Sequence, residues 1–336
     1  MQKKFCLFFH YVKIIPRIMF ASGSTISYLR RMKNYIQTKF AENPAKTSST
    51  ITVTLVLILV IIKSVALYIS GSAAVLSALI DSLSDIGLSL MTLISVQWAM
   101  KPADEDHRHG HGKVEGIAAL IQAMMLAGGG MFLVLESFGR FVHPVEISDH
   151  IFTMILMAVS VGLSVLISKV QTAGAKQSDS LAVEADSLHY SADVLINGSV
   201  LLVVLADYTG LLGPWLDPLS AIGVAFIMMR TAYKIVLSAF GMLLDQELPD
   251  ATRHQIIAKI KSHPSVLGLH DLRTSKSGTK ILMSFDIELS PDLSLYKAHD
   301  ISRQIEESLL LDFPNSEIMI HIDPAGDIQD SRHRDL

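Results

Sequence analysis

Six long apolar segments constrain this chain more than any other feature of its sequence. Each is close to the roughly 20 residues that an α-helix needs to cross about 30 Å of hydrocarbon. Of the 336 residues, 50% are hydrophobic and only 18% are charged, whereas an ordinary soluble domain carries about 25% charged residues. The sequence therefore predicts six transmembrane helices. We expect them at residues 50–69, 73–100, 114–142, 150–169, 178–206 and 216–240.

Basic residues alternate between the connections of these segments. The first, third and fifth connections contain no Lys or Arg. The second connection and the region before the first segment contain several, and Lys169 and Lys176 lie between the fourth and fifth segments. Because cytoplasmic loops carry the excess of Lys and Arg, this pattern predicts six spans with both termini cytoplasmic. Lys63, inside the first segment, is an exception with two interpretations: its side chain reaches toward the membrane surface, or it faces the interior of the bundle.

The parts outside the bundle differ in composition. Residues 1–49 form a basic arm, with no Asp or Glu before Glu42. An organellar targeting peptide, an unstructured arm and an extension before a true start at Met32 all remain open. Residues 245–328 show the pattern of a small soluble domain with the order αββαβ, which indicates an α+β fold. Residues 329–336 form a polar tail.

Charge and cysteine content limit the chemistry. The chain has 28 basic and 32 acidic residues, a net charge of −4, so nothing in the total indicates binding to nucleic acid. Cys6 is the one cysteine, which excludes an intramolecular disulfide and a metal site built from cysteines. Any metal ligands must therefore be His, Asp or Glu.

Two pairs of ionisable residues lie deep in predicted membrane helices. Asp81 and Asp85 are four residues apart in the second segment, and His189 and Asp193 repeat that spacing in the fifth, so each pair projects from one helix face. Insertion scales put the free-energy cost of an Asp at the centre of a membrane helix at about 2.5 to 3.5 kcal/mol, so we expect a cation to offset the charge. Three carboxylates and one imidazole suit a tetrahedral ion such as Zn²⁺ better than Mg²⁺ or Ca²⁺.

Proton exchange follows from the charge of this set. Without a metal ion the four groups carry about −3, which burial makes costly, and metal ligation requires their deprotonation. We therefore expect protons to replace the departing ion, so that the chain works as a metal/proton antiporter. His189 and the three carboxylates would titrate.

Two further groups of residues lie outside the membrane segments. The second cytoplasmic connection is rich in His, and Asp104, His107 and His111 could converge on a metal there, although a solvated connector is an equal interpretation. The soluble domain contains several His and Asp residues that spacing alone does not assemble into one site: His270, Asp286, His299, His321 and Asp323.

These motifs together resemble the cation diffusion facilitator family, in particular its bacterial ferrous-iron and zinc efflux pumps. The resemblance covers roughly residues 45–325. Its strongest stretches are 77–87, 102–113, 188–193, 270–274 and 320–324. The resemblance implies six-helix protomers in a homodimer, a metallochaperone-like cytoplasmic domain, alternating access, and a location in the bacterial inner membrane.

The resemblance also implies roles for individual residues. The transport site would be Asp81, Asp85, His189 and Asp193. The loop site would be Asp104, His107 and His111. The cytoplasmic binuclear site would be His270, Asp286, His299, His321 and Asp323, although relatives have a His where this chain has Asp286. Lys113 and Asp245 match positions that pair charges between the membrane and soluble parts, although they could equally be two ordinary flanking charges. Zn²⁺ would be both transported and regulatory, with Cd²⁺ or Fe²⁺ as alternatives.

Two other functions compete with transport. Asp-rich membrane helices also hold Mg²⁺ against diphosphate substrates in prenyl-transferring enzymes, but neither the second nor the fifth segment has the cluster of Lys and Arg that phosphates need. A membrane-anchored metal sensor would leave the buried Asp and His pairs unexplained. The sequence therefore favours a secondary transporter over an enzyme.

Overall fold

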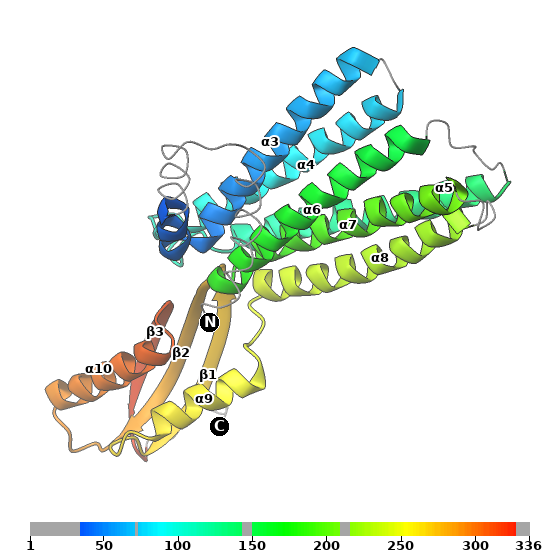
Figure 1. The fold of residues 1–336 in the computed structure, drawn as a ribbon. Helices are drawn as coiled ribbons and strands as arrows, with labels where there is room; N and C mark the ends of the chain where they lie inside the picture. The colour runs from blue at the N-terminus through cyan, green and yellow to red at the C-terminus, as the bar shows by residue number, and fades with distance from the viewer. Residues whose placement is uncertain (1–33, 71–72, 143–149, 209–215, 327–336) are drawn as a thin grey trace.

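The computed structural model describes residues 34–70, 73–142, 150–208 and 216–326. Within them, six long helices precede a smaller α/β part (Figure 1). The long helices are α3 (Pro44–Ser70), α4 (Ala73–Ala99), α5 (Val114–Val142), α6 (His150–Ser178), α7 (Leu181–Tyr208) and α8 (Leu216–Leu243). All six are long and apolar enough to cross a membrane, which confirms the predicted six-helix architecture.

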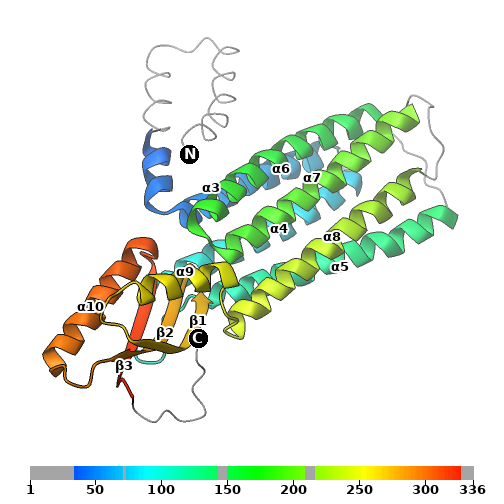
Figure 2. The ribbon, with the colours of Figure 1, turned by 90° about the horizontal axis from the view of Figure 1, so that it is seen from below.

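The long helices lie side by side in two groups. Helices α5 and α8 pack along each other. Helix α6 packs against α7 and α3, and α3 also packs against α4. Figure 2 shows the α5–α8 pair beside the other four helices. Helix α7 contacts α4, α5 and α8 as well as α6, so the helix that carries His189 and Asp193 lies between the two groups.

Several helices extend beyond the apolar segments that reveal them. Helix α3 begins at Pro44, and α6 continues to Ser178 before the chain turns at Asp179, whose φ is 57°. Hydropathy marks only the part of a helix that lies in lipid, whereas the backbone stays helical into the polar interface. Residues 34–42 are also helical. The remainder of the predicted basic arm, residues 1–33, and the tail at 329–336 lie outside the described residues.

The smaller part has two layers, with two helices covering one face of a three-stranded sheet (Figure 1). Its elements follow the predicted order αββαβ. They are α9 (Asp250–Lys261), β1 (Gly268–Ser277), β2 (Lys280–Leu289), α10 (Leu295–Asp312) and β3 (Ser316–Pro324). Strand β2 is central, antiparallel to β1 and parallel to β3.

Alternation along the strands separates a core face from a polar face. On β2, Phe285 and Ile287 are almost fully buried, and they pack with residues of α9 and α10 such as Ile260 and Leu309. Between them on the strand, Asp286 points to the opposite face. The register places Asp286 beside both His270 of β1 and His321 of β3.

A β-bulge in β1 orients the residues after His270. Asp271 and Leu272 together oppose a single residue of β2, and Asp271 has a φ of 50°, a left-handed conformation that Asp tolerates better than most residues. Leu272 thereby returns to the buried core, while Arg273 points outward and donates to the Asp271 carboxylate at 2.7 Å. The sequence alternation by itself does not predict this bulge.

The hairpin between β1 and β2 touches the membrane bundle. At the end of the loop before α5, Gly112 lies so close to Ser277 and Gly278 that a Cβ on Gly112 would collide with the Ser277 carbonyl. Both sides of this contact are backbone, which cannot yield as a flexible side chain would. The contact therefore requires glycine at position 112.

We predict that Gly112→Ala loosens the connection between the bundle and the smaller domain. It should lower the midpoint of thermal unfolding in detergent and accelerate proteolytic cleavage at residues 101–113. Gly128→Ala is the matched control, because a Cβ there meets nothing within 4 Å. Identical unfolding and cleavage of the two variants would contradict this interpretation of the contact.

Candidate metal sites

Three clusters of His and Asp side chains in the described residues have the geometry to hold a metal ion. In each, one ligand atom per residue lies within 4.8 Å of the others. One cluster lies inside the bundle, one in the loop before α5, and one on the sheet of the smaller domain. They are Asp85, His189 and Asp193; Asp104, His107 and His111; and His270, Asp286 and Asp323.

The membrane cluster joins α4 to α7 near the middle of both helices. His189 Nε2 lies 3.3 Å from an Asp85 carboxylate oxygen and 3.7 Å from one of Asp193. The three side chains are only 14%, 14% and 17% exposed. His189 Nδ1 is buried with no hydrogen-bond partner among the described residues. Two carboxylates therefore hold the imidazole, and the three groups face a common point.

Asp81 lies one turn from Asp85 on the same face of α4. It is exposed and is not one of the three residues that already meet. Its carboxylate interacts electrostatically with Asp85, His189 and Lys63. The sequence grouped Asp81 with the other three residues, whereas the structure brings together only Asp85, His189 and Asp193.

Buried polar contacts surround this cluster. Asp186, fully buried one turn before His189, accepts a hydrogen bond from Gln171 of α6. Tyr190 and Ser89 lie 2.7 Å apart, linking α7 to α4. None of these residues is among the predicted ligands. The signal that could have found Asp186 is its spacing of three residues before His189 on the same helix.

The loop cluster is built around one carboxylate. The two oxygens of Asp104 lie 3.2 Å from His107 Nδ1 and 3.2 Å from His111 Nε2. The backbone N–H of His107 donates to Asp104 at 2.7 Å, and this hydrogen bond is the main cause that lowers the pKa of the Asp104 carboxyl. The spacing prediction that these three residues converge is consistent with this geometry.

The sheet cluster is centred on a buried histidine. His270 is 2% exposed. Its Nε2 lies 3.3 Å from an Asp323 oxygen, and its Nδ1 lies 3.7 Å from one of Asp286. Cross-strand pairing produces this arrangement, because His270 pairs with Asp286, and Asp323 lies on the same face two residues beyond His321. These residues are far apart in sequence, which explains why spacing did not assemble them.

Two of the predicted ligands lie outside this cluster. His321 is 67% exposed and its Nε2 lies 3.0 Å from the other Asp323 oxygen. His299 lies on an exposed position of α10 and is not one of the clustered residues. Glu288, which the sequence analysis did not name, has an oxygen 3.9 Å from His270 Nε2. Its position two residues after Asp286 on one strand is the signal that could have found it.

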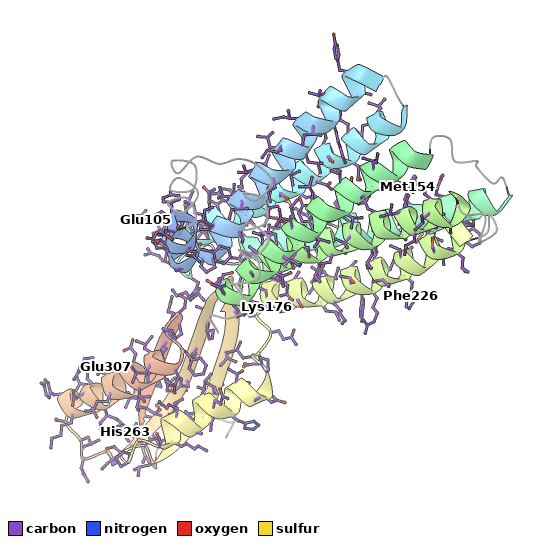
Figure 3. The ribbon with its side chains drawn as sticks, viewed as in Figure 1. Glu105, Met154, Lys176, Phe226, His263 and Glu307 are labelled. Atoms are coloured by element: carbon purple, nitrogen blue, oxygen red, sulfur yellow. The ribbon has the colours of Figure 1, made fainter. Side chains whose placement is uncertain are left out.

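Ion pairs connect the smaller domain to the bundle near the loop cluster. Lys113 donates to Asp245 at 2.7 Å, the pairing that the sequence resemblance implied. Lys276 of β1 pairs with Asp179 between α6 and α7, and His109 of the loop lies 3.7 Å from Glu317 of β3. Figure 3 shows Lys176 at the end of the bundle that faces the smaller domain and Met154 toward the other end.

The donor chemistry is the same in all three clusters. Each combines at least one imidazole nitrogen with carboxylate oxygens, a set that suits Zn²⁺ and other divalent transition metals. The membrane cluster differs from the others because apolar helices surround it.

Known proteins share this organisation. The cation efflux transmembrane domain family matches residues 49–244, and the cytoplasmic domain family of cation efflux proteins matches residues 248–325. The chain is 37% identical to the cation-efflux pump FieF of Escherichia fergusonii and to that of Shigella flexneri serotype 5b. Each match spans 268 residues, 79% of this chain and 88% of the relative.

A solved structure also aligns with part of the chain. It is that of CzrB, described as a putative zinc transporter in its Zn form, with 26% sequence identity and a TM-score of 0.24, covering 26% of this chain and 99% of that one. The two family matches and the FieF relatives, which together account for most of the chain, carry the assignment. This chain therefore belongs to the cation efflux, or cation diffusion facilitator, family, and it is an integral membrane cation efflux transporter rather than an enzyme.

Proposed function

We propose that this chain exports a divalent transition-metal ion from the cytoplasm in exchange for protons, with Zn²⁺ as its first cargo. The observation that carries the proposal is the meeting of Asp85, His189 and Asp193 between two membrane helices. Asp81, one turn away, completes the set when its side chain turns inward. Alternating access would open this set first to the cytoplasm and then to the opposite side.

Proton exchange is supported by the charge of the site. Without a metal, several carboxylates would face one another in a medium of low dielectric constant, where like charges repel strongly. Protons relieve this repulsion and must leave again before a metal ion binds. Metal and protons therefore compete for the same oxygens, which is the condition for antiport.

The preference for zinc is supported by the imidazole. A nitrogen donor beside carboxylates favours Zn²⁺ and Cd²⁺ over harder ions such as Mn²⁺, and Fe²⁺ lies between them. The order of binding affinities alone does not identify which of these four ions is the physiological cargo. Competition between these ions in a flux assay measures the cargo directly.

Orientation follows from the distribution of basic residues. Lys113 and Lys176 lie at the end of the bundle that faces the smaller domain, and a cytoplasmic location of that end agrees with the positive-inside rule. We propose that both termini are cytoplasmic and that the membrane is a bacterial inner membrane. We place the domain limits at 50–244 and 245–328.

We propose that the chain works as a homodimer, with metal on the cytoplasmic domain as a regulator. A metal held by His270 and its neighbours would stiffen that domain. Contacts through Lys113 and the β1–β2 hairpin would then bias the bundle toward one access state. The loop cluster lies beside these contacts and would add to the same bias.

We predict that Asp85→Ala abolishes transport. The initial rate of ⁶⁵Zn²⁺ uptake into proteoliposomes under a pH gradient should fall at least about tenfold, since losing even an outer-shell partner of a metal costs about 10- to 100-fold in affinity. Ser84→Ala, the adjacent residue of α4, should leave the rate unchanged. Full uptake by Asp85→Ala, or no uptake by the unmodified protein, would reject the proposal.

We predict that His189→Asp shifts selectivity toward harder ions. Replacing the nitrogen donor with an oxygen should raise the ratio of Mn²⁺ to Zn²⁺ transport. The measurement is paired uptake of the two ions at equal concentration. A ratio equal to that of the unmodified protein would show that His189 does not ligate the cargo.

We predict unequal effects of the histidines of the cytoplasmic domain. His270→Ala should reduce the zinc bound per protomer after equilibrium dialysis of the full chain in detergent, because His270 contacts both carboxylates of its cluster. His299→Ala should reduce it less, because His299 lies outside the cluster. Equal losses, or a greater loss with His299→Ala, would contradict the arrangement of the sheet cluster.

A further inference from the structure

A lysine is buried inside the membrane bundle beside the transport cluster. Lys63, on α3, is 5% exposed, and its ammonium donates to the Ser82 hydroxyl at 2.6 Å. Ser82 is fully buried on α4 between the two aspartates of that helix. The structure thus excludes one of the two interpretations left open by the sequence, because the side chain of Lys63 faces the bundle interior.

The charge of this ammonium acts on all three carboxylates of the transport site. Lys63 interacts electrostatically with Asp81, Asp85 and Asp193. Its hydrogen bond to Ser82 holds the charge beside α4 without making it a metal ligand. An ammonium group offers donors and no acceptor, so while charged it cannot coordinate a cation.

Including Lys63 changes the charge of the site. Three carboxylates and a neutral imidazole carry about −3, and the ammonium brings the total to about −2. A divalent ion then leaves the loaded site neutral, the state that costs least in a low-dielectric medium. Without Lys63 the loaded site would keep a charge of about −1, and the attraction for the metal would be stronger.

We propose that Lys63 is the resident counter-cation of the transport site. This inference rests on the proposed transport function. The ammonium compensates part of the carboxylate charge when metal is absent, and it repels the bound ion, which lowers affinity and speeds release. A transporter that binds its cargo too tightly turns over slowly, so this repulsion favours turnover.

The competing explanation is that Lys63 only ties α3 to α4 through its hydrogen bond. Three variants separate charge from hydrogen bonding. Lys63→Gln removes the charge and keeps a donor for Ser82, Lys63→Arg keeps both, and Ser82→Ala removes the acceptor and keeps the charge. Lys46→Met is the matched control, because it removes an exposed lysine from the same helix.

The test is the concentration dependence of ⁶⁵Zn²⁺ uptake into proteoliposomes. We expect Lys63→Gln to lower KM about tenfold and to lower kcat as well, since slower release follows tighter binding. Lys63→Arg, Ser82→Ala and Lys46→Met should stay within about twofold of the unmodified protein. Structural damage would instead raise KM or lower the folded yield.

Binding gives a second readout in the same variants. Each variant is compared with the same variant that also carries Asp85→Ala. The difference in bound zinc between the two is the zinc held at the transport site, because the other two clusters contribute equally to both. Lys63→Gln should bind this zinc more tightly than Ser82→Ala.

The outcomes distinguish this inference from the proposed function. If the unmodified protein transports no zinc, the proposed function fails. If it transports zinc and Lys63→Gln leaves KM and affinity unchanged or weakens them, the counter-cation role is overturned while transport stands. A Ser82→Ala variant that matches Lys63→Gln would assign the effect to the hydrogen bond instead of the charge.

Discussion

The electrostatic cost of acidic side chains inside an apolar bundle governs the rest of this structure. Asp85 and Asp193 face each other across α4 and α7 with His189 between them. Water would solvate such groups, whereas lipid-embedded helices cannot, so a cation must meet them. Metal, proton and the ammonium of Lys63 are the cations that the described bundle can bring to these oxygens, and the proposed transport cycle consists of exchanging two of them.

Contacts at the cytoplasmic end join the smaller domain to the bundle. The β1–β2 hairpin contacts Gly112, and Lys113 pairs with Asp245, which lies just after the end of α8. The loop cluster lies in the same segment as these contacts, immediately before α5. Because α5 packs along α8 and against α7, it connects the hairpin contact to the helix that carries His189.

Sequence patterns are most informative where the chemistry lies within one element. The pairs on α4 and α7 follow from helical spacing, and the convergence of Asp104, His107 and His111 needs only a short loop. Spacing is less informative on the sheet, where His270 of β1 contacts Asp323 of β3 across the central strand. Strand register decides that meeting, and it depends on which residues of each strand pack against α9 and α10.

The sequence by itself determined the six membrane helices, the αββαβ order and the residue types able to bind metal, because hydropathy and side-chain spacing are local properties. Tertiary structure alone decided that Asp85 rather than Asp81 touches His189, that His299 stands apart from His270, and that Lys63 turns inward to Ser82. These outcomes depend on how helices rotate against one another and on how strands align. A one-residue difference in either moves a side chain to another face.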